Sequence, residues 1–294
     1  MEKQKKIFAL GFFDGVHKGH QMVFDLCQHL AKDAGAATAA ITFEKHPQSL
    51  FTPNPPALLN TTEDRRWLIQ TWAGIDGLLV LPVNEQMMNL SWQDFLEKLL
   101  QEGAAGFVCG YDFRFGKNGE GNAEKLQNFC AARYLPCAIV PEQTLDGKRI
   151  SSTYIRSLIE DGDMIAAAQF LGHLHILSGE VVPGRHLGRT IDTPTANILL
   201  PEGVVVPKLG VYACLCDVDG RTYVAVTNIG SRPTVNGHQE RVEAWILDFD
   251  GCLYGKRITL RFHKFLRPEQ KFSSLEELKK QIQRDAGKAY MLLK

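Results

Sequence analysis

The chain has 294 residues, a length that suits two domains better than one. Hydrophobic residues make up 45% and charged residues 22% of the sequence, which is ordinary for a globular protein. Lys plus Arg and Asp plus Glu both number 33, so the net charge is zero, and no overall electrostatic attraction to nucleic acid or membrane is expected.

The N-terminus and the cysteines bear on where the protein works. The chain starts with the charged run MEKQKK, and the apolar run after it is too short for a signal peptide. No stretch of the sequence is long enough to span a membrane. The seven cysteines are scattered without a C-x-x-C pair, which favours reduced thiols and a cytoplasmic protein. Cys214 and Cys216 share one face of a predicted strand, so we expect them to pack rather than to bind metal.

Over residues 1–175, short apolar runs alternate with helical patterns. The apolar runs predict buried strands at 6–10, 36–43, 77–82, 106–110 and 136–140. The helical patterns cover 21–35, 62–74, 91–103 and 122–133. This alternation predicts an α/β domain with a Rossmann-like parallel sheet covered on both faces. Ligands of such sheets bind beyond the carboxyl ends of the strands, so the loops after Leu10, Phe43 and Cys109 should line a site.

The stretch GFFDGVHKGHQ (11–21) follows the first predicted strand and carries two histidines three residues apart. Gly15 and Gly19 allow backbone to approach a ligand closely, and a helix that begins near Gly19 or His20 would turn free amides toward that ligand. His17 and His20 then reach the same oxygen atoms, so the turn predicts a phosphate site. The alternative is a tight turn with two surface histidines, and two histidines alone make a poor metal site.

Two further segments carry groups suited to phosphate or to a flat ring. ISSTYIR (150–156) has three hydroxyl residues before a helix and Arg156 one turn inside it. These residues either cap the helix or bind phosphate. GYDFRFGKNGEGN (110–122) follows a predicted strand and carries Asp112, Arg114 and two phenylalanines. The phenylalanines either hold a flat ligand ring or pack the loop.

The pattern changes near residue 175. Two short helices, 152–160 and 163–172, close the first half, and strands separated by turn residues such as DVDGR follow. The strands are predicted at 175–182, 211–218, 222–229, 242–249 and 256–266. Their consecutive spacing predicts a small antiparallel barrel.

An amphipathic pattern over 273–293 predicts a terminal helix capped by Ser273 or Ser274. The sequence therefore predicts two domains of different class. We expect an α/β domain at 1–175 and a β-barrel domain with a terminal helix at 176–294.

Two segments of the second half end or begin at strands and carry polar side chains. In TIDTPTANI (190–198), Pro194 fixes the backbone, and Thr195 and Asn197 offer oxygens two residues apart that suit Mg²⁺. The alternative is a polar turn that enters a strand. NIGSRPT (228–234) is predicted to be a loop after a strand, where its backbone and Arg232 either meet a phosphate or a ring edge or form a plain turn.

Glu243, in RVEAWILDF (241–249), shares one face of a predicted strand with apolar residues. A lone carboxylate on such a face is costly unless it is paired or used. Glu243 acts either as a general base for a hydroxyl or as the partner of an arginine such as Arg241 or Arg232.

Four segments, in order along the chain, resemble the adenylyltransferase module of the bacterial bifunctional riboflavin kinase/FAD synthetase family. They are Gly11 to His20, TFEKHP (42–47), GYDFRFG (110–116) and ISSTYIR (150–156). The second departs from the family pattern, since Lys45 stands where proline is common. The resemblance implies that the phosphate of FMN attacks the α-phosphorus of ATP and releases pyrophosphate. Such a step needs positioning and charge stabilisation but no protein nucleophile.

The resemblance also implies roles for individual residues of the first half. His17 and His20 would take part in catalysis. The ATP-binding residues would be Gly11, Phe13, Asp14, Gly15, His17, His20, Ser151, Ser152, Thr153 and Arg156. The flavin-binding residues would be Phe43, His46, Pro47, Asp112, Phe113, Arg114 and Phe115.

The second half resembles the riboflavin kinase module of the same family. The resemblance rests on PTAN, N-I-G-x-R-P-T, the glutamate of VEAWILDF and LYG (253–255). It implies that Thr195 and Asn197 hold Mg²⁺ with ATP and that Glu243 activates the ribityl 5′-hydroxyl of riboflavin. Further kinase residues for ATP and flavin would be Gly184, Gly188, Asn228, Arg232 and Thr234.

The kinase module departs from the family at two places. Asp192 and Thr193 stand where Gly-Phe is common, and the loop PGRHLGR (183–189) has lost small residues. The Asp192 carboxylate either recruits Mg²⁺, as a hard oxygen ligand, or repels the ATP phosphates. We expect repulsion with partial relief by Mg²⁺, and like charges about 4 Å apart near a surface cost a few kcal/mol at most.

The sequence thus predicts a cytoplasmic bifunctional enzyme that converts riboflavin to FMN and FMN to FAD. Its substrates would be ATP, riboflavin and FMN, its cofactor Mg²⁺, and its state a monomer or weak homo-oligomer without nucleic-acid or membrane partners. Two alternatives are an adenylyltransferase whose barrel binds flavin without phosphorylating it well, and a non-catalytic flavin sensor. A relic of a tRNA synthetase is disfavoured by the neutral charge.

Overall fold

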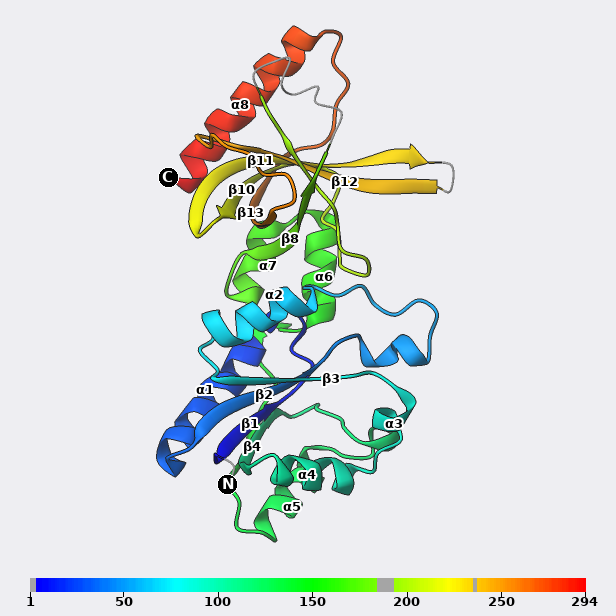
Figure 1. The fold of residues 1–294 in the computed structure, drawn as a ribbon, viewed down its shortest axis with the longest axis vertical. Coiled ribbons are helices and arrows are strands. Elements are labelled where there is room, and N and C mark those ends of the chain that lie inside the picture. The colour runs from blue at the N-terminus through cyan, green and yellow to red at the C-terminus, as the bar shows by residue number, and fades with distance from the viewer. Residues whose placement is uncertain (1–3, 184–192, 235–236) are drawn as a thin grey trace. The chain divides into compact units, whose positions relative to one another are not determined.

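The structure, a computed structural model, describes residues 4–183, 193–234 and 237–294. The chain forms two compact units, one of Met1–Leu58 with Thr62–Ser152 and one of Leu59–Thr61 with Thr153–Lys294 (Figure 1). Helices α6 (Ser152–Asp161) and α7 (Met164–Leu171) group almost wholly with the second unit. The division of the two functional domains after residue 175 stays a prediction.

The first unit is built on a five-stranded parallel sheet, as predicted. Its strand order is β3-β2-β1-β4-β5, and every neighbouring pair is parallel. The strands are β1 (Lys6–Leu10), β2 (Ala37–Phe43), β3 (Gly77–Leu81), β4 (Ala104–Gly110) and β5 (Cys137–Val140). Because β1 lies in the middle, the segment after Leu10 emerges between the carboxyl ends of β2 and β4, where ligands of such sheets bind.

Helices cover both faces of this sheet. On one face, Phe8, Leu10 and Phe107 form a core with α4 (Trp92–Gln101) and α5 (Ala123–Ala131). On the other face, α1 (Lys18–Ala34) packs against β1 and β4 through Val23, Phe24 and Cys27. Shorter elements connect them: η1 (Asp14–Val16), η2 (Pro47–Leu50), α2 (Thr62–Trp67), the π-helical η3 (Leu68–Trp72), α3 (Glu85–Met88), η4 (Lys117–Gly119), β6 (Thr144–Leu145) and β7 (Lys148–Arg149). The single helix predicted over 62–74 is therefore divided into α2 and η3.

The second unit contains a closed antiparallel barrel, as predicted, with the strand order β10-β11-β12-β9-β8-β13. Its strands are β8 (His175–Val182), β9 (Ala196–Ile198), β10 (Gly210–Val218), β11 (Arg221–Thr234), β12 (Gly237–Ile246) and β13 (Arg257–Arg267). One prediction was wrong here. Residues 228–234 form the end of β11 rather than a loop, because the ladder to β12 continues to the pair Thr234 and Gly237. The short strand β9 had no predicted bounds, although one interpretation of TIDTPTANI was a polar turn that enters a strand.

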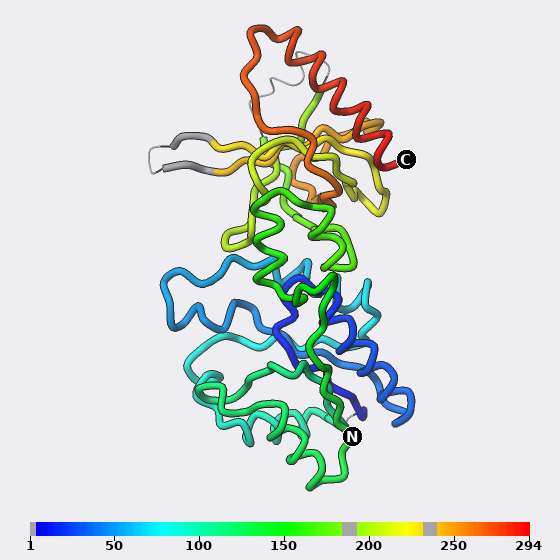
Figure 2. Tube along the Cα trace, turned by 180° about the vertical axis from the view of Figure 1, so that it is seen from behind, coloured from blue at the N-terminus to red at the C-terminus, as the bar shows by residue number. Residues whose placement is uncertain are grey.

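Side chains alternate between the inside and the outside of the barrel. Tyr212, Cys214 and Cys216 are fully buried on one side of β10, which confirms that the two cysteines share a face. The outward residues Val211 and Ala213 pack against α8 (Leu275–Leu293), which lies along β10 and β11 (Figures 1 and 2). Ser274 caps α8 by accepting the amide of Glu277 at 3.2 Å. None of the described helices combines the length and the apolar character that crossing a bilayer requires.

Candidate active sites

The turn after β1 has an unusual backbone. Phe13 (φ 57°) and Val16 (φ 45°) lie in the left-handed region, as does Gly15 (φ 81°). A left-handed conformation costs an L-residue about 1–2 kcal/mol, so the surrounding structure must hold the turn in place. A Cβ at Gly11 would lie 2.6 Å from the Phe13 ring, which explains the glycine at that position.

Hydrogen bonds from distant segments hold this turn. The Thr42 hydroxyl donates to the Phe12 carbonyl at 2.6 Å, and the Ser152 hydroxyl donates to the Asp14 carbonyl at 2.9 Å. We call residues 11–20, the turn after β1 with its two histidines, the histidine turn. The predicted site segments TFEKHP and ISSTYIR therefore both contact the histidine turn. Asp14 is buried, as are Gly15 and Val16.

His17 and His20 lie together at the start of α1. The helix begins at Lys18, slightly earlier than predicted, and His17 caps it by accepting the His20 amide at 3.3 Å. The two imidazole rings stack with centroids 3.6 Å apart at an angle of 15°. Burial lowers the pKa of His20 well below 6.5, and His17 and Arg65 lower it further. His20 is therefore a neutral imidazole at pH 7, and its buried Nδ1 has no hydrogen-bond partner among the described residues.

Arg65 on α2 is a residue of this site that the sequence reasoning missed. It is fully buried, its Nη1 donates to the Phe12 carbonyl at 3.1 Å, and its guanidinium lies 4.5 Å from the Phe12 ring centroid. Burial lowers its pKa to about 10, and the Asp14 carboxylate opposes this, so Arg65 is charged at pH 7. One signal was available. Arg65 precedes the buried Leu68 and Ile69 by three and four residues, which places it on the buried face of a helical pattern.

The remaining predicted ATP ligands are divided between the units. Ser151 and Ser152 are half-buried in the first unit, and Ser152 bonds the turn as described above. Thr153 is exposed and Arg156 is half-buried, and both lie on α6 in the second unit. Their assignment to ATP stays a prediction.

Phe12 is also the centre of an aromatic group beside the turn. Phe43, at the end of β2, lies 6.5 Å from the Phe12 ring, and His46 meets that ring edge-on at 5.2 Å. His46 caps η2, whose first residue is Pro47, by accepting the Gln48 amide at 3.2 Å. The predicted flavin residues of the TFEKHP segment therefore lie next to the histidine turn.

The loop after β4 carries the other predicted flavin residues. Phe115 is buried in the core against Phe95, so it packs the loop, which was one of its two predicted roles. Phe113 is half-buried and stacks on Phe115 at 5.5 Å. Asp112 pairs with Arg149 at 2.5 Å. Arg114 is exposed on the same loop.

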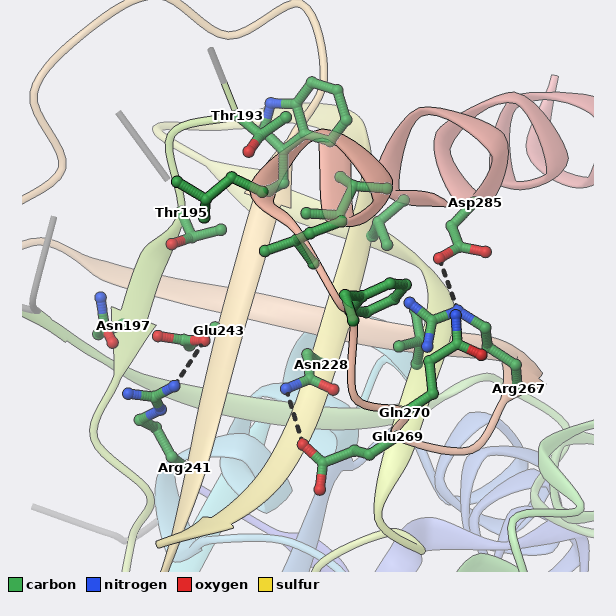
Figure 3. A pocket seen from close by; sticks show the side chains of 17 residues that line it. Thr193, Thr195, Asn197, Asn228, Arg241, Glu243, Arg267, Glu269, Gln270 and Asp285 are labelled. Atoms are coloured by element: carbon green, nitrogen blue, oxygen red, sulfur yellow. Dashed lines mark hydrogen bonds and ion pairs between the residues drawn. The ribbon is translucent and has the colours of Figure 1, made fainter. Parts of the chain in front are cut away.

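In the second unit, strand pairing brings the predicted kinase residues into one row. Asn197 on β9 lies opposite Glu243 on β12, and Glu243 lies opposite Asn228 on β11. The row continues to Val211 on β10 and Arg267 on β13. Figure 3 shows Asn197 and Glu243 side by side, with Asn228 on the other side of Glu243. The barrel wall thus carries three adjacent polar side chains on its outer face, those of Asn197, Glu243 and Asn228, which we call the polar row.

Glu243 has the arginine partner that was one of its two predicted states. Arg241 Nη2 lies 2.9 Å from Glu243 Oε2 (Figure 3). Burial raises the pKa of Glu243 above its usual 4.5, Arg241 opposes this shift, and Glu269 adds to it. The Asn228 side-chain amide donates to Glu269 at 3.2 Å. An ion pair does not exclude a base, so the role of Glu243 in catalysis stays a prediction.

The polar row lines a cavity of about 400 Å³ between the barrel wall and α8. Its apolar lining includes Val226, Trp245 and Phe272, and Thr193 and Thr195 face it as well (Figure 3). The hydroxyl of Thr193 is buried and has no hydrogen-bond partner among the described residues. At the far end, the fully buried Asp285 of α8 pairs with Arg267 at 2.8 Å.

A second cavity, of about 250 Å³, adjoins the first. Thr195 and Asn197 line both cavities, so the PTAN segment stands between them. The second cavity is otherwise lined by residues such as Pro194, Phe249 and Tyr254. Two ligands bound in the two cavities would therefore meet at Thr195 and Asn197.

Some predicted kinase residues fall outside this description. Gly184, Gly188 and Asp192 lie outside the described residues. Arg232 and Thr234 lie in β11, but their side chains are outside the described part of the structure. Within residues 4–183, 193–234 and 237–294, no group of three or more histidine, cysteine or acidic residues is arranged to hold a metal ion.

Comparisons with known proteins cover both halves of the chain. Residues 1–154 match the family model described as FAD synthetase, and residues 171–293 match the one described as riboflavin kinase. The bifunctional riboflavin kinase/FMN adenylyltransferase of Bacillus subtilis is 35% identical over 98% of this chain and 92% of its own length. The enzyme of the same name from Listeria monocytogenes is 37% identical over 95% of this chain and 90% of its own length.

A solved structure matches nearly the whole chain. It is named as a macrolide-efflux protein from Streptococcus pneumoniae, and it is similar to this chain with a TM-score of 0.86 at 30% identity. The match covers 98% of this chain and 94% of that one. The match therefore extends over both units of the present chain.

Proposed function

The chain belongs to the family of bifunctional riboflavin kinase/FMN adenylyltransferase enzymes, and from that premise we propose which residues perform each reaction. The two activities are the phosphorylation of riboflavin to FMN and the adenylylation of FMN to FAD. We assign FMN adenylylation to the histidine turn after β1 and riboflavin phosphorylation to the polar row around Glu243.

At the histidine turn, one oxygen of the FMN phosphate attacks the α-phosphorus of ATP, and the bond to the β-phosphate breaks to release pyrophosphate. The nucleophile already carries negative charge, so the protein needs no base. Its task is to align the two phosphates and to donate hydrogen bonds to the leaving group. The free amides at the start of α1 and the neutral His20, with His17 stacked on it, are suited to this task.

The aromatic group beside the turn supports a flavin ligand there. We propose that the isoalloxazine ring lies among Phe43, His46 and Phe113, with Pro47, Asp112 and Arg114 at its edge, because these segments end at the carboxyl edge of the sheet. ATP would contact Gly11, Phe13, Asp14 and Gly15. Ser151, Ser152, Thr153 and Arg156 complete the proposed ATP set.

In the barrel, Glu243 accepts the proton of the ribityl 5′-hydroxyl as that oxygen attacks the γ-phosphorus of ATP, and the bond from this phosphorus to the β-phosphate oxygen breaks to release ADP. Its raised pKa makes it a better proton acceptor. We propose that riboflavin occupies the cavity of about 400 Å³, against Trp245 and Phe272, and that ATP occupies the adjoining cavity. The observation that carries this assignment is that Asn197 lies opposite Glu243 and, with Thr195, lines both cavities.

The oxygen atoms of Thr195 and Asn197 fit Mg²⁺, which prefers oxygen ligands, keeps several waters and is held largely by substrate phosphates. A bound Mg²⁺ neutralises charge on the transferred phosphate. Thr195 and Asn197 would hold it beside the polar row, while Gly184, Gly188, Asn228, Arg232 and Thr234 complete the proposed kinase set.

We further propose a cytoplasmic protein that works as a monomer or weak homo-oligomer on small molecules. All seven cysteines are free, which supports a reducing compartment. Sedimentation at several protein concentrations tests the oligomeric state.

The sites are tested by incubating the purified protein with ATP, Mg²⁺ and either riboflavin or FMN and then separating the flavins by chromatography. We expect FMN and FAD from riboflavin, and FAD from FMN. The assignment of sites predicts that substitutions in the histidine turn stop only the conversion of FMN to FAD and that substitutions at Glu243 stop only the conversion of riboflavin to FMN. Loss of both reactions in a folded single variant, with riboflavin and FMN supplied in separate assays, would contradict the two-site model.

A further inference from the structure

We propose that Arg65 positions the histidine turn for FMN adenylylation. Its guanidinium holds the Phe12 carbonyl and balances the Asp14 carboxylate, so that the turn presents hydrogen-bond donors rather than a negative charge to the ATP phosphates. This inference rests on the proposed placement of the reaction at the histidine turn, and it adds a residue that does not itself contact the reacting atoms.

The first argument is geometric. The Phe12 carbonyl accepts two hydrogen bonds, one from Arg65 Nη1 at 3.1 Å and one from Thr42 at 2.6 Å. Phe12 directly precedes the left-handed Phe13, so this carbonyl fixes the peptide at which the strained turn begins. A strained backbone persists only where its surroundings over-determine it. Arg65, which is fully buried, is therefore one of the groups that hold this end of the turn.

The second argument is electrostatic. Asp14 is buried in the turn, and a carboxylate next to bound phosphates would repel them. The Asp14 carboxylate and the Arg65 guanidinium stabilise each other's charged forms, as the opposing effect of Asp14 on the pKa of Arg65 shows. Removing Arg65 would therefore take away a positive charge that offsets the buried carboxylate beside the phosphate site, which is costly for any polyanionic ligand.

Two buried nitrogens without partners support a ligand at this place. Arg65 Nε and His20 Nδ1 are both buried and have no hydrogen-bond partner among the described residues. Buried polar atoms are normally satisfied, so a group left unsatisfied needs an explanation, and a bound ligand is one that fits both nitrogens. Arg65 also lowers the pKa of His20, so the two side chains interact electrostatically across the turn.

The test uses the full-length protein with FMN supplied and riboflavin absent, so that only adenylylation is measured. The variants are Arg65→Met, which removes the charge, Arg65→Lys, which keeps it without the planar fork, and Arg65→Met combined with Asp14→Asn. Arg66→Met, at the exposed neighbour on the same helix, is the matched control. The riboflavin kinase rate of each preparation reports on the folding of the second unit, and thermal melting reports on the first.

We expect Arg65→Met to lower kcat/KM for ATP in adenylylation by about 100-fold, in the range of losing one preorganised electrostatic contact. The double variant should have a kcat/KM about tenfold higher than that of Arg65→Met, because the carboxylate that repels the phosphates is gone. Arg65→Lys should lose about three- to tenfold in kcat. Arg66→Met and the kinase rates should stay at the wild-type level.

A second readout separates this role from a merely structural one. ADP, AMP and adenosine are used as competitive inhibitors against ATP in the adenylylation reaction. Arg65→Met should weaken inhibition by ADP most, by AMP less and by adenosine least, since repulsion grows with phosphate charge. A structural defect would reduce the fraction of active enzyme and leave the inhibition constants of ADP, AMP and adenosine at their wild-type values. Equal losses of kcat/KM in Arg65→Met and Arg65→Lys, with wild-type inhibition constants for all three inhibitors, would overturn the proposal. Wild-type kinetics in Arg65→Met would overturn it as well.

Two further outcomes keep the proposal separate from its premise. If Arg65→Met does not fold, Arg65→Lys decides, and a wild-type rate in that variant rejects the positioning role. His20→Ala is measured in parallel. Full adenylylation activity in His20→Ala would reject the placement of the reaction at this turn, whereas its loss together with wild-type kinetics in Arg65→Met would reject only the role of Arg65.

Discussion

The histidine turn and the polar row both face the phosphates of ATP in our proposal, yet they carry opposite chemistry. The turn offers the imidazole of His20, which is neutral at pH 7, together with helix amides and a buried guanidinium. The row centres on a carboxylate whose pKa is raised by burial. The nucleophile explains the difference. A phosphate attacks without losing a proton, so the turn needs donors, whereas a hydroxyl must lose its proton, so the row needs a base.

The two regions are also held differently. The turn is fixed by bonds from segments far along the chain, such as Thr42, Arg65 and Ser152. The row is set by the register of β9, β12 and β11. A substitution in either region should therefore affect one reaction and spare the other, and the following predictions test this separation.

Glu243→Gln should have the largest effect. It keeps shape and hydrogen bonding but removes the base, so riboflavin kinase turnover should fall by roughly two to four powers of ten. FMN adenylylation should persist at the wild-type rate. The measurement is initial-rate chromatography of FMN and FAD. An unchanged kinase rate would show that Glu243 only pairs with Arg241.

His20→Ala should have the next largest effect, on the opposite reaction. FAD formation from FMN should fall by about 10²- to 10³-fold, because a preorganised donor to the leaving phosphates is lost. Riboflavin phosphorylation should remain near wild type. His29→Ala, on the exposed side of the same helix α1, is the matched control and should change neither rate. A kinase rate that falls in parallel with FAD formation would contradict the separation of the two reactions into two sites.

Much of this architecture could be predicted from the sequence. The parallel sheet and the barrel follow from local hydrophobic patterns, because each strand has a recognisable pattern within a few residues. The histidine turn was also predictable, since its glycines, aspartate and histidines are contiguous in GFFDGVHKGH. What its sequence did not reveal was the left-handed backbone at Phe13 and Val16.

The polar row was harder to predict because it depends on register. Asn197 and Glu243 are 46 positions apart in the numbering, and only the pairing of β9 with β12 places them opposite each other. Residues 228–234 contain a glycine and a proline, which favoured a loop, yet the long ladder to β12 makes them a strand. Arg65 was missed because TEDRR resembles an exposed helix start, and its burial depends on the fold of the turn that it contacts.

Arg241→Gln should change the pH dependence of the kinase. Arg241 holds down the pKa of Glu243, which burial raises above 4.5. Without Arg241 this pKa rises further, and the base is lost at a higher pH as the solution is acidified. The acid limb of kcat/KM for riboflavin phosphorylation should therefore move to higher pH, and a rise of one in the pKa of Glu243 lowers the rate on that limb about tenfold. Arg221→Gln, at the exposed start of β11, should leave the profile unchanged, and an acid limb that moves to lower pH in Arg241→Gln would contradict the prediction.

Thr193→Val should give the smallest effect, and it tests whether the cavity beside the polar row binds a kinase substrate. The Thr193 hydroxyl is buried, faces the cavity that Glu243 lines, and has no hydrogen-bond partner among the described residues. We expect it to bond a ligand, because a buried hydroxyl without a partner is costly. Valine keeps the shape and removes that bond, so KM for riboflavin or for ATP in the kinase reaction should rise by about five- to tenfold, which corresponds to a net hydrogen bond of about 1 kcal/mol. Thr193→Ser keeps the hydroxyl and should behave like wild type, and adenylylation should not change in either variant. If Thr193→Val instead binds both kinase substrates as well as wild type and melts at a higher temperature, the hydroxyl is an unsatisfied group of the barrel wall rather than part of the site.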